Sequence, residues 1–448
     1  MIRLLSNPVI ATSLYFLIIN IAFFLNFIKF NLNSFFYYVT DELFLLKFIF
    51  CVSPTILLLK KKISFGLSSS IIFCLFIFVY IPIIVFFFDG SSAIFSLLAK
   101  TKYYIPSNNF ELRDILKIHF ILCLIFSSFF YLLKEDINKK NIYFFKLKNE
   151  FFFKFLKIVF FVFLSIIVLR LLEIMNTDGV NFENSNLELR GYLTGFFGYI
   201  VYWTTDLIFP LIIFYNLIKK NKKNYFLFSI IFYIAFYLIF GSNVFLAILL
   251  IILLYFLFYK VDPKIRNFFF NDSMRFYLII GISFTLIITI IYSIYLYIGI
   301  KEFSIGHYFF KRIYFVQSRN FYLYYDTFNS AAHYFFTNIS ILRDIGLHEI
   351  TPSKLVMSNY PYGNLSAHYL SVEGIASLGV YGLILSSFIL FFILRFIDKF
   401  NYFSNQDGVF NIYYFIIATY FMNINLSVIL FTHGLIFIVI LCFLKLEN

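Results

Sequence analysis

Residues 359–382 read NYPYGNLSAHYLSVEGIASLGVYG and lead from a polar part of the chain into an apolar run that begins at Val372. They include the end of the only long polar interval in the sequence, residues 299–371. This interval holds basic residues and four of the six histidines, among them Lys311, Arg312, Arg319, Arg343, Lys354, His307, His333, His348 and His368. Because the remainder is mostly apolar sequence with short connectors, we expect any chemistry to be held by this interval.

Long apolar runs dominate the rest of the chain. Of its 448 residues, 62% are hydrophobic and 13% are charged, and the mean hydropathy is +0.88. Apolar runs of about 18 or more residues cross a bilayer as helices. The runs lie at residues 9–30, 43–59, 63–88, 115–133, 158–174, 193–218, 225–240, 244–259, 276–298, 372–395, 409–422 and 426–444. They predict an all-α polytopic membrane protein with about twelve transmembrane helices. We expect one membrane domain over residues 1–448, with 299–371 as a large external loop between helices 9 and 10.

The basic residues predict the orientation of these helices. Cytoplasmic loops of membrane proteins carry an excess of Lys and Arg. Basic clusters lie on alternate connectors, at residues 60–62, 134–157, 219–223, 260–275 and 395–399. This pattern places both termini in the cytoplasm and the long loop outside. The same rule explains most of the net charge of +13, so we expect no nucleic-acid partner.

The sequence lacks the motifs of nucleotide, dinucleotide and metal chemistry. It contains no glycine-rich phosphate loop, no dinucleotide fingerprint, no HExxH and no Cys/His ligand spacing. The cysteines all lie inside apolar runs and are interpreted as small buried hydrophobic residues: Cys51, Cys74, Cys123 and Cys442. We therefore predict neither a cofactor nor a bound metal ion.

Arginines at or above the predicted outer face are candidate anion ligands: Arg190, Arg312, Arg319 and Arg343. Arginine binds phosphate oxygens through two parallel hydrogen bonds and keeps its charge near lipid. An enzyme that acts on a lipid pyrophosphate must hold two negative groups and stabilise the charge that develops as they leave. Alternatively, these arginines are solvated or paired with Asp326, Asp344 and Glu349.

Two histidines of the polar interval and an acid just after it are candidate general bases. A hydroxyl that acts as a nucleophile is helped by a group that accepts its proton. Glu373 lies where the loop re-enters a helix, His368 precedes it by five residues, and His333 lies within the loop. A loop histidine can equally have only a structural role. The glycines that follow are expected to permit close helix packing: Gly374, Gly379 and Gly382.

Asp206 lies in the middle of the apolar run 193–218, four residues before Pro210. An acidic side chain at membrane depth is costly to bury and marks functional sites, and a proline kinks a helix. The structural alternative is an ion pair. Lys47 is the candidate partner, because it is the other charge buried within an apolar run.

Three segments carry a family resemblance. The first runs from Leu189-Arg190-Gly191 through Trp203 to Pro210, and the second is the Gly241-Ser242-Asn243 break before an apolar helix. The third, residues 369–382, has an acid followed by a glycine-containing helix start after the large outer loop. Together they resemble the bacterial oligosaccharide repeat-unit polymerases of O-antigen and capsule synthesis, the Wzy type. Relatives often have Gly-Ser-Arg at the second segment, so Asn243 removes one expected phosphate-binding charge.

The resemblance implies a GT-C-like membrane glycosyltransferase, independent of metal, in the bacterial cytoplasmic (inner) membrane. A growing glycan on undecaprenyl pyrophosphate would be transferred to the non-reducing-end hydroxyl of another lipid-linked repeat unit. The implied partners are that lipid-linked oligosaccharide, the bilayer, and a chain-length regulator and a flippase of the same pathway. The pyrophosphate and glycan ligands would be Arg190, Arg312, Arg319, Arg343, Asn243 and Asp206. Assistance to the attacking hydroxyl would come from Glu373, His368 or His333.

Three other functions stay open. A lipid-linked oligosaccharide flippase has a similar number of helices, but we expect short loops and a cationic cavity in such a transporter. An O-antigen ligase shares much of the polymerase architecture, and sequence separates the two poorly. A polyprenyl-phosphate-sugar glycosyltransferase would carry acids in its first outer loop, where Asp41-Glu42 lies. That loop is short for the surrounding helices such an enzyme needs.

Overall fold

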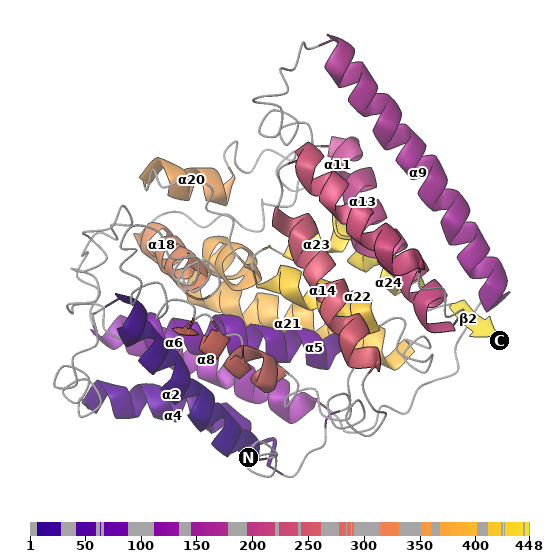
Figure 1. Ribbon diagram of the computed structural model, residues 1–448. Helices are drawn as coiled ribbons and strands as arrows, with labels where there is room; N and C mark the ends of the chain where they lie inside the picture. Colours follow the sequence, from indigo (N-terminus) through magenta and orange to yellow (C-terminus); the bar gives the residue numbers. More distant parts are fainter. Residues whose placement is uncertain are drawn as a thin grey trace. The chain divides into compact units, whose positions relative to one another are not determined.

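The fold is known from a computed structural model in which almost every described residue is helical, as the sequence predicts (Figure 1). The described residues are 7–27, 42–59, 63, 67–87, 112–133, 145–177, 195–219, 224–240, 243–260, 277–283, 285–287, 289–290, 314, 316–330, 351–359, 368–400, 411–422, 424, 426–441 and 444–447. The chain forms two compact units. Unit 1 comprises Met1–Asp136, Phe269–Ile393 and Phe421–Leu426, and unit 2 comprises Ile137–Phe268, Leu394–Tyr420 and Ser427–Asn448.

Five described helices are long and apolar enough to cross a membrane: Leu67–Val85, Asp114–Leu132, Glu150–Asn176, Phe196–Leu217 and Leu370–Ile397. Shorter apolar helices cover Pro8–Ala22, Phe44–Ile56, Asn224–Phe240, Val244–Leu253 and Tyr277–Ile287. Each of these segments overlaps one of the apolar runs in the sequence. Their length and composition are those of a membrane protein.

Unit 1 is built around one continuous helix. Its described elements are α2 (Pro8–Phe27), α4 (Glu42–Ile56), α5 (Leu67–Leu75), η1 (Phe76–Tyr80), α6 (Ile81–Phe87), α8 (Leu112–Leu132), α18 (Val316–Ser330), α20 (Pro352–Asn359), η5 (Leu370–Ile375) and most of α21 (Ala376–Phe400). The segments α5, η1 and α6 follow one another without a break, and every residue from 67 to 85 is buried. Tyr15 of α2 donates a hydrogen bond to the Ile77 carbonyl within the π-helical η1. Because the helix is apolar on all sides, it forms the centre of this unit.

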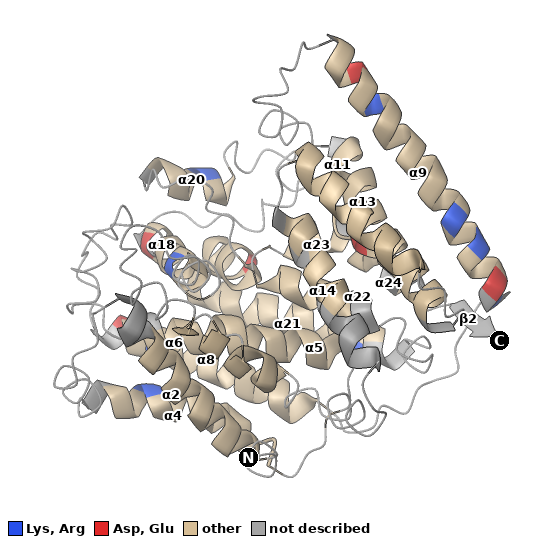
Figure 2. Cartoon of the chain, viewed as in Figure 1, with Lys and Arg blue, Asp and Glu red and all other residues tan. Residues whose placement is uncertain are grey.

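Unit 2 contains a long helix with an exposed apolar surface. Its described elements are β1 (Phe145–Lys148), α9 (Asn149–Thr177), α11 (Gly195–Tyr202), η2 (Trp203–Ile208), α12 (Phe209–Phe214), η3 (Tyr215–Lys219), α13 (Asn224–Phe240), α14 (Asn243–Lys260), most of α22 (Asn411–Phe421) and of α23 (Leu426–Phe431), α24 (Leu435–Leu441) and β2 (Leu444–Glu447). On α9, Phe161 and Leu169 are 61% and 66% exposed. The charged residues of α9 gather toward its two ends (Figure 2). An uncharged middle with exposed apolar side chains suits contact with lipid.

Two short strands depart from the all-α prediction. β1 and β2 pair in parallel, with Phe145 opposite Leu444 and Lys148 opposite Glu447. Both segments, FKLK and LKLE, alternate apolar and charged residues, which is the period of a strand. The strand conformation of each segment therefore agrees with its local sequence pattern.

Candidate functional site

The polar interval 299–371 supplies a buried helix, α18, to unit 1. Although its sequence is far less apolar than the membrane-spanning helices, most of its residues are buried. Its buried hydroxyls donate to carbonyl groups four residues earlier in the chain: Ser318 Oγ to Tyr314 at 2.9 Å and Thr327 Oγ1 to Leu323 at 2.8 Å. Local hydrogen bonds of this kind lower the cost of burying polar side chains.

One face of α18 packs on η5, the helix start that carries Glu373. The Phe321 ring stacks on the His368 ring, with centroids 6.0 Å apart. One helical turn further on, Tyr324 lies within electrostatic range of Glu373. Burial, and secondarily Glu373, raises the pKa of Tyr324 above its ordinary value. Two of the predicted general-base candidates therefore face α18.

Glu373 is 3% exposed and lies in a π-helical turn. The chain departs from helical geometry soon afterwards, at Leu378 and Gly379, where Gly379 has φ 60° and ψ −137°. Side chains other than glycine rarely adopt a positive φ. A Cβ atom added at Gly382 would overlap the carbonyl oxygen of Gly374. The glycines thus allow close packing, as predicted, but between two parts of one kinked helix.

His368 begins this helical segment. Its main-chain carbonyl accepts hydrogen bonds from the Ser371 and Val372 amides at 3.0 and 3.3 Å. The side chain is fully buried, and neither ring nitrogen makes a hydrogen bond within the described part of the chain. Burial lowers the pKa of His368 to about 3, although the nearby Gln317 carbonyl opposes the shift. A histidine kept neutral in this way is a weak base.

Of the four arginines predicted to bind anions, the described residues include Arg319 alone. It lies on α18 and is only 3% exposed. Its Nε and Nη2 both donate to Asn320 Oδ1, at 3.4 and 3.0 Å. A buried guanidinium held by a neighbouring amide is a fixed positive charge on the helix that covers Glu373.

A second buried acid lies in unit 2. Asp206 is fully buried in the π-helical η2, and His433 Nδ1 donates to its Oδ2 at 2.6 Å. Thr205 Oγ1 lies 2.8 Å from Asp206 Oδ1 and 3.0 Å from the Val201 carbonyl. Tyr420 stacks on the His433 ring at 3.9 Å between centroids. A hydrogen-bond partner of Asp206 is thus a histidine, where the sequence suggested an ion pair with Lys47.

His433 is carried by a break between two short helices. Thr432, His433 and Gly434 separate α23 from α24, and Gly434 has φ 77°. A Cβ atom at Gly434 would lie 3.3 Å from Leu207 and 3.7 Å from Trp203, so this turn packs on η2. Sequence analysis missed His433 as a site residue. A histidine followed by glycine inside the apolar run 426–444 was the pattern that could have indicated it.

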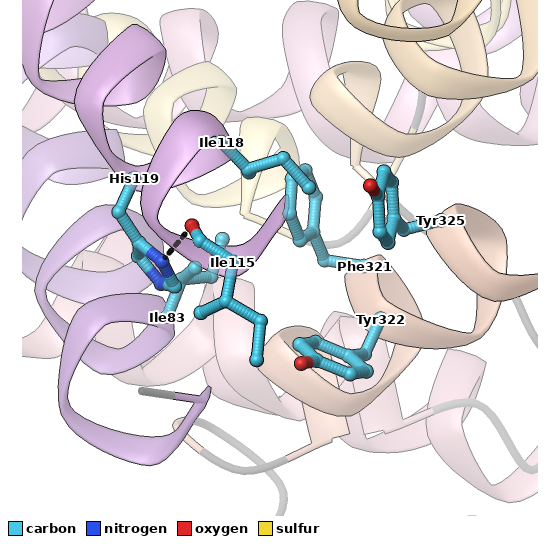
Figure 3. A pocket seen from close by; sticks show the side chains of 7 residues that line it. All are labelled: Ile83, Ile115, Ile118, His119, Phe321, Tyr322 and Tyr325. Carbon is cyan, nitrogen blue, oxygen red and sulfur yellow. Dashed lines mark hydrogen bonds between the residues drawn. The ribbon is translucent and has the colours of Figure 1, made fainter. Parts of the chain in front are cut away.

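A small pocket lies under α18 (Figure 3). It is lined by Ile83 of α6, by Ile115, Ile118 and His119 of α8, and by Phe321, Tyr322 and Tyr325 of α18. His119 Nδ1 donates to the Ile115 carbonyl at 2.7 Å. The cavity volume of about 10 Å³ is near the minimum for one water molecule. The pocket is therefore too small for a sugar.

The predicted site residues divide between the units. Glu373, His368 and Arg319 lie on packed elements of unit 1, whereas Asp206 lies in unit 2. Asn243 is the first residue of α14, and its side chain lies outside the described part. Four predicted residues also lie outside the described residues: Arg190, Arg312, Arg343 and His333. Cys51, Cys74 and Cys123 are buried and free, as expected for small hydrophobic residues.

Comparison with protein-family models, with curated proteins and with solved structures finds no match for this chain.

Proposed function

We propose that this protein is an oligosaccharide repeat-unit polymerase of the Wzy type, with about twelve transmembrane helices and a GT-C-like fold. It joins undecaprenyl-pyrophosphate-linked units at the outer face of the bacterial cytoplasmic membrane. The observation that carries the proposal is the packing of α18, from the polar interval, on the helix start that holds Glu373. This packing gives a fixed cation and a buried acid to one region of unit 1.

The contacts of α18 agree with the predicted orientation. α18 packs on α6 and η5, and the pocket brings it against the first turns of α8. Each of these segments is the end of an apolar run that the basic clusters place outside. In unit 2, β1 and β2 join residues 145–148 to residues 444–447, two segments that the same pattern places in the cytoplasm. The contacts of α18 support an external site for this helix. The strand pairing supports a common side for residues 145–148 and 444–447.

The reaction needs charge stabilisation and a proton acceptor. Transfer breaks the bond between the sugar C1 and the pyrophosphate oxygen and forms a bond to the acceptor hydroxyl, whose proton must be taken up. Glu373 is the favoured acceptor, because His368 is too weak a base. Arg319 is suited to the charge on the departing pyrophosphate. Since α18 covers Glu373, acceptor entry requires α18 to move, as lids in other enzymes do.

Complementation of a deletion strain tests the proposal through the glycan profile on a gel. Glu373→Gln should lower long-chain glycan by about 10²–10⁴-fold and leave core plus one repeat unit. Arg319→Gln should reduce chain length similarly, whereas Lys354→Gln, on the exposed face of α20, should give the normal profile. Membrane protein level is measured for each variant. Normal polymer from both Glu373→Gln and Arg319→Gln would refute this assignment of the site.

The strain itself separates the alternatives. Loss of all surface glycan, with lipid-linked units accumulating outside, would indicate a ligase. Accumulation on the cytoplasmic face would indicate a flippase. A transporter is the second candidate because unit 2 has a broken helix, α23–α24, facing a buried acid. Broken helices at membrane depth line the ion sites of secondary transporters.

A further inference from the structure

The first turns of α9 in unit 2 carry two lysines, Lys154 and Lys157, and one acid, Glu150 (Figure 2). Neither lysine forms an ion pair within the described part of the chain. At the other end of the same helix, Arg170 Nη1 is paired with Glu173 Oε2 at 2.5 Å. Glu150 can balance one of the two lysine charges, so at least one lysine has no counter-ion among the described residues.

Lys157 is held by polar groups of two neighbouring helical segments. Its Nζ donates to Asn216 Oδ1 of η3 at 3.5 Å and to the Tyr225 hydroxyl of α13 at 3.4 Å. It also lies 5.6 Å from the centre of the Tyr225 ring. Asn216 is fixed in turn, because its Nδ2 donates to the Ile212 carbonyl at 2.7 Å. These contacts use two of the three ammonium protons and leave the Tyr225 proton unused, so both groups can donate to a further acceptor.

Apolar side chains that face outward surround this polar cluster. Phe155 and Ile158 of α9 and Leu227 of α13 are each more than half exposed. The two helices are in contact, since the rings of Phe160 and Phe232 lie 5.7 Å apart between centroids. The cluster thus lies at one end of two adjacent helices with exposed apolar faces. A lipid with a charged head group and apolar chains matches this arrangement.

The length of α9 places its lysines near the depth of lipid phosphates. The span Glu150–Asn176 has 27 residues, or about 40 Å, which is the thickness of a bilayer with its head groups. The hydrocarbon takes up about 30 Å, so its boundary lies roughly 5 Å from each end. Lys154 lies about 6 Å from Glu150, at this boundary, and Lys157 lies about one turn deeper. A lysine at that depth extends its ammonium group toward the head groups.

We propose that Lys154, Lys157 and Tyr225 form a binding site for one phospholipid with a net negative charge. Lys157 and the Tyr225 hydroxyl donate to the phosphodiester oxygens, and Lys154 supplies a second positive charge. The acyl chains lie along the outward faces of α9 and α13. The lipid is the counter-ion that the lysine end of α9 otherwise lacks. This site depends on the membrane span of α9 and involves neither Glu373 nor glycan transfer.

A lipid fits the cluster better than a soluble anion or a second copy of the chain does. A soluble phosphate ion would make no contact with the apolar faces beside the lysines. Two copies in one bilayer share an orientation, so a symmetric contact through α9 would bring like charges together. The charge and the apolar faces together therefore favour a lipid.

The test is native mass spectrometry of the full-length protein, released from detergent micelles that contain added phosphatidylglycerol or phosphatidylcholine. The wild-type protein should bind one phosphatidylglycerol about tenfold more tightly than phosphatidylcholine, whose head group carries no net charge. Lys154→Gln/Lys157→Gln should lower the affinity for phosphatidylglycerol about 30-fold, and Tyr225→Phe, which keeps the ring, about threefold. The control Arg170→Gln/Lys354→Gln removes the same charge from other places and should bind like the wild type.

Any of four results would overturn the proposal. Equal affinity of the wild-type protein for the two lipids would show that the head-group charge is not recognised. Equal losses in the two double variants would show that only net charge matters. Displacement of the lipid by inorganic phosphate would indicate a site for a soluble anion. A lipid-free dimer that requires the two lysines would indicate a contact between copies of the chain.

Should the lysine variants fail to fold, the wild-type protein decides through Trp203, the single tryptophan of the chain. Its ring lies 6.5 Å from that of Phe163 on α9, between centroids. Phe163 follows Lys157 by six residues, about 9 Å along the helix. Phosphatidylglycerol brominated midway along its acyl chains should therefore quench Trp203 emission more strongly than phosphatidylcholine brominated at the same position. Equal quenching at the same mole fraction would refute the site.

Discussion

Each unit buries one acidic side chain in a π-helical segment, but the two acids have different neighbours. Glu373 in η5 of unit 1 faces the phenol groups of Tyr324 and Tyr369. Asp206 in η2 of unit 2 is hydrogen-bonded to His433. The first acid is covered by a helix from the polar interval, and the second by apolar helices. The same local distortion thus holds a candidate base in unit 1 and a hydrogen-bonded Asp–His pair in unit 2.

Both distorted segments satisfy their freed carbonyl groups with side chains. In the region of η2, Thr204 Oγ1 donates to the Ile200 carbonyl at 2.7 Å, and Tyr233 donates to the Thr205 carbonyl. After η5, Ser377 Oγ donates to the Val372 carbonyl at 3.2 Å. Within a bilayer such compensation is required, because water is absent. The neighbours, not the distortion, decide what each acid can do.

The largest expected effect breaks the pair of unit 2. His433→Leu should destabilise the protein by about 3–5 kcal/mol, because Asp206 is left buried without its partner. The double variant Asp206→Asn/His433→Leu should recover most of that loss. The measurement is an unfolding titration in detergent. A single variant within about 1 kcal/mol of wild type would show that the Asp206–His433 contact contributes little to the unfolding free energy.

The next largest effect concerns His368 in unit 1. His368 has its pKa lowered to about 3, against 6.5 for an ordinary histidine. As the pH falls below 6.5, the unfolded chain therefore binds a proton at His368 that the folded protein does not bind. Stability from this residue is complete above about pH 6.5 and falls as the pH drops toward 3, by up to roughly 4 kcal/mol.

His368→Gln should remove this part of the acid sensitivity. The unfolding free energy of both proteins is measured against pH, and the difference between them isolates His368 from the carboxylates. Equal slopes in the two proteins between pH 6.5 and 3 would contradict the buried neutral state.

Local patterns in the sequence predicted most of the helices and part of the site. Apolar runs located the helices because a bilayer requires length and hydrophobicity, which are local properties. Glu373 was singled out because an acid at the re-entry of a loop into a helix is unusual. Helicity in α18 was not foreseen, since its balance of polar and apolar residues resembles that of a loop.

Local sequence patterns could not predict contacts between distant residues or irregular segments within helices. Asp206 and His433 lie 227 positions apart, and no spacing rule connects them. The π segments differ from α-helix by one residue in the hydrogen-bonded ring, which leaves the hydrophobic period almost unchanged. The partner of Asp206 and the kink at Gly379 therefore required coordinates.

A smaller effect tests the kinked helix under Glu373. Gly382→Ala should cost about 1–3 kcal/mol, because the added methyl group overlaps the Gly374 carbonyl and forces η5 to shift. Gly374→Ala is the matched control, since its methyl group meets the far end of the Leu383 side chain, Cδ2, at 2.8 Å. Its cost should be lower. Equal losses in the two variants would mean that η5 and α21 do not depend on this close approach.

The smallest effect concerns the hydroxyl that supports η2. Tyr233→Phe removes the 2.6 Å hydrogen bond to the Thr205 carbonyl and should cost about 0.5–1.5 kcal/mol of unfolding free energy. Tyr381→Phe, at a residue 80% exposed, is the control and should have almost no effect. A Tyr233→Phe protein with wild-type stability would show that η2 does not depend on this hydrogen bond.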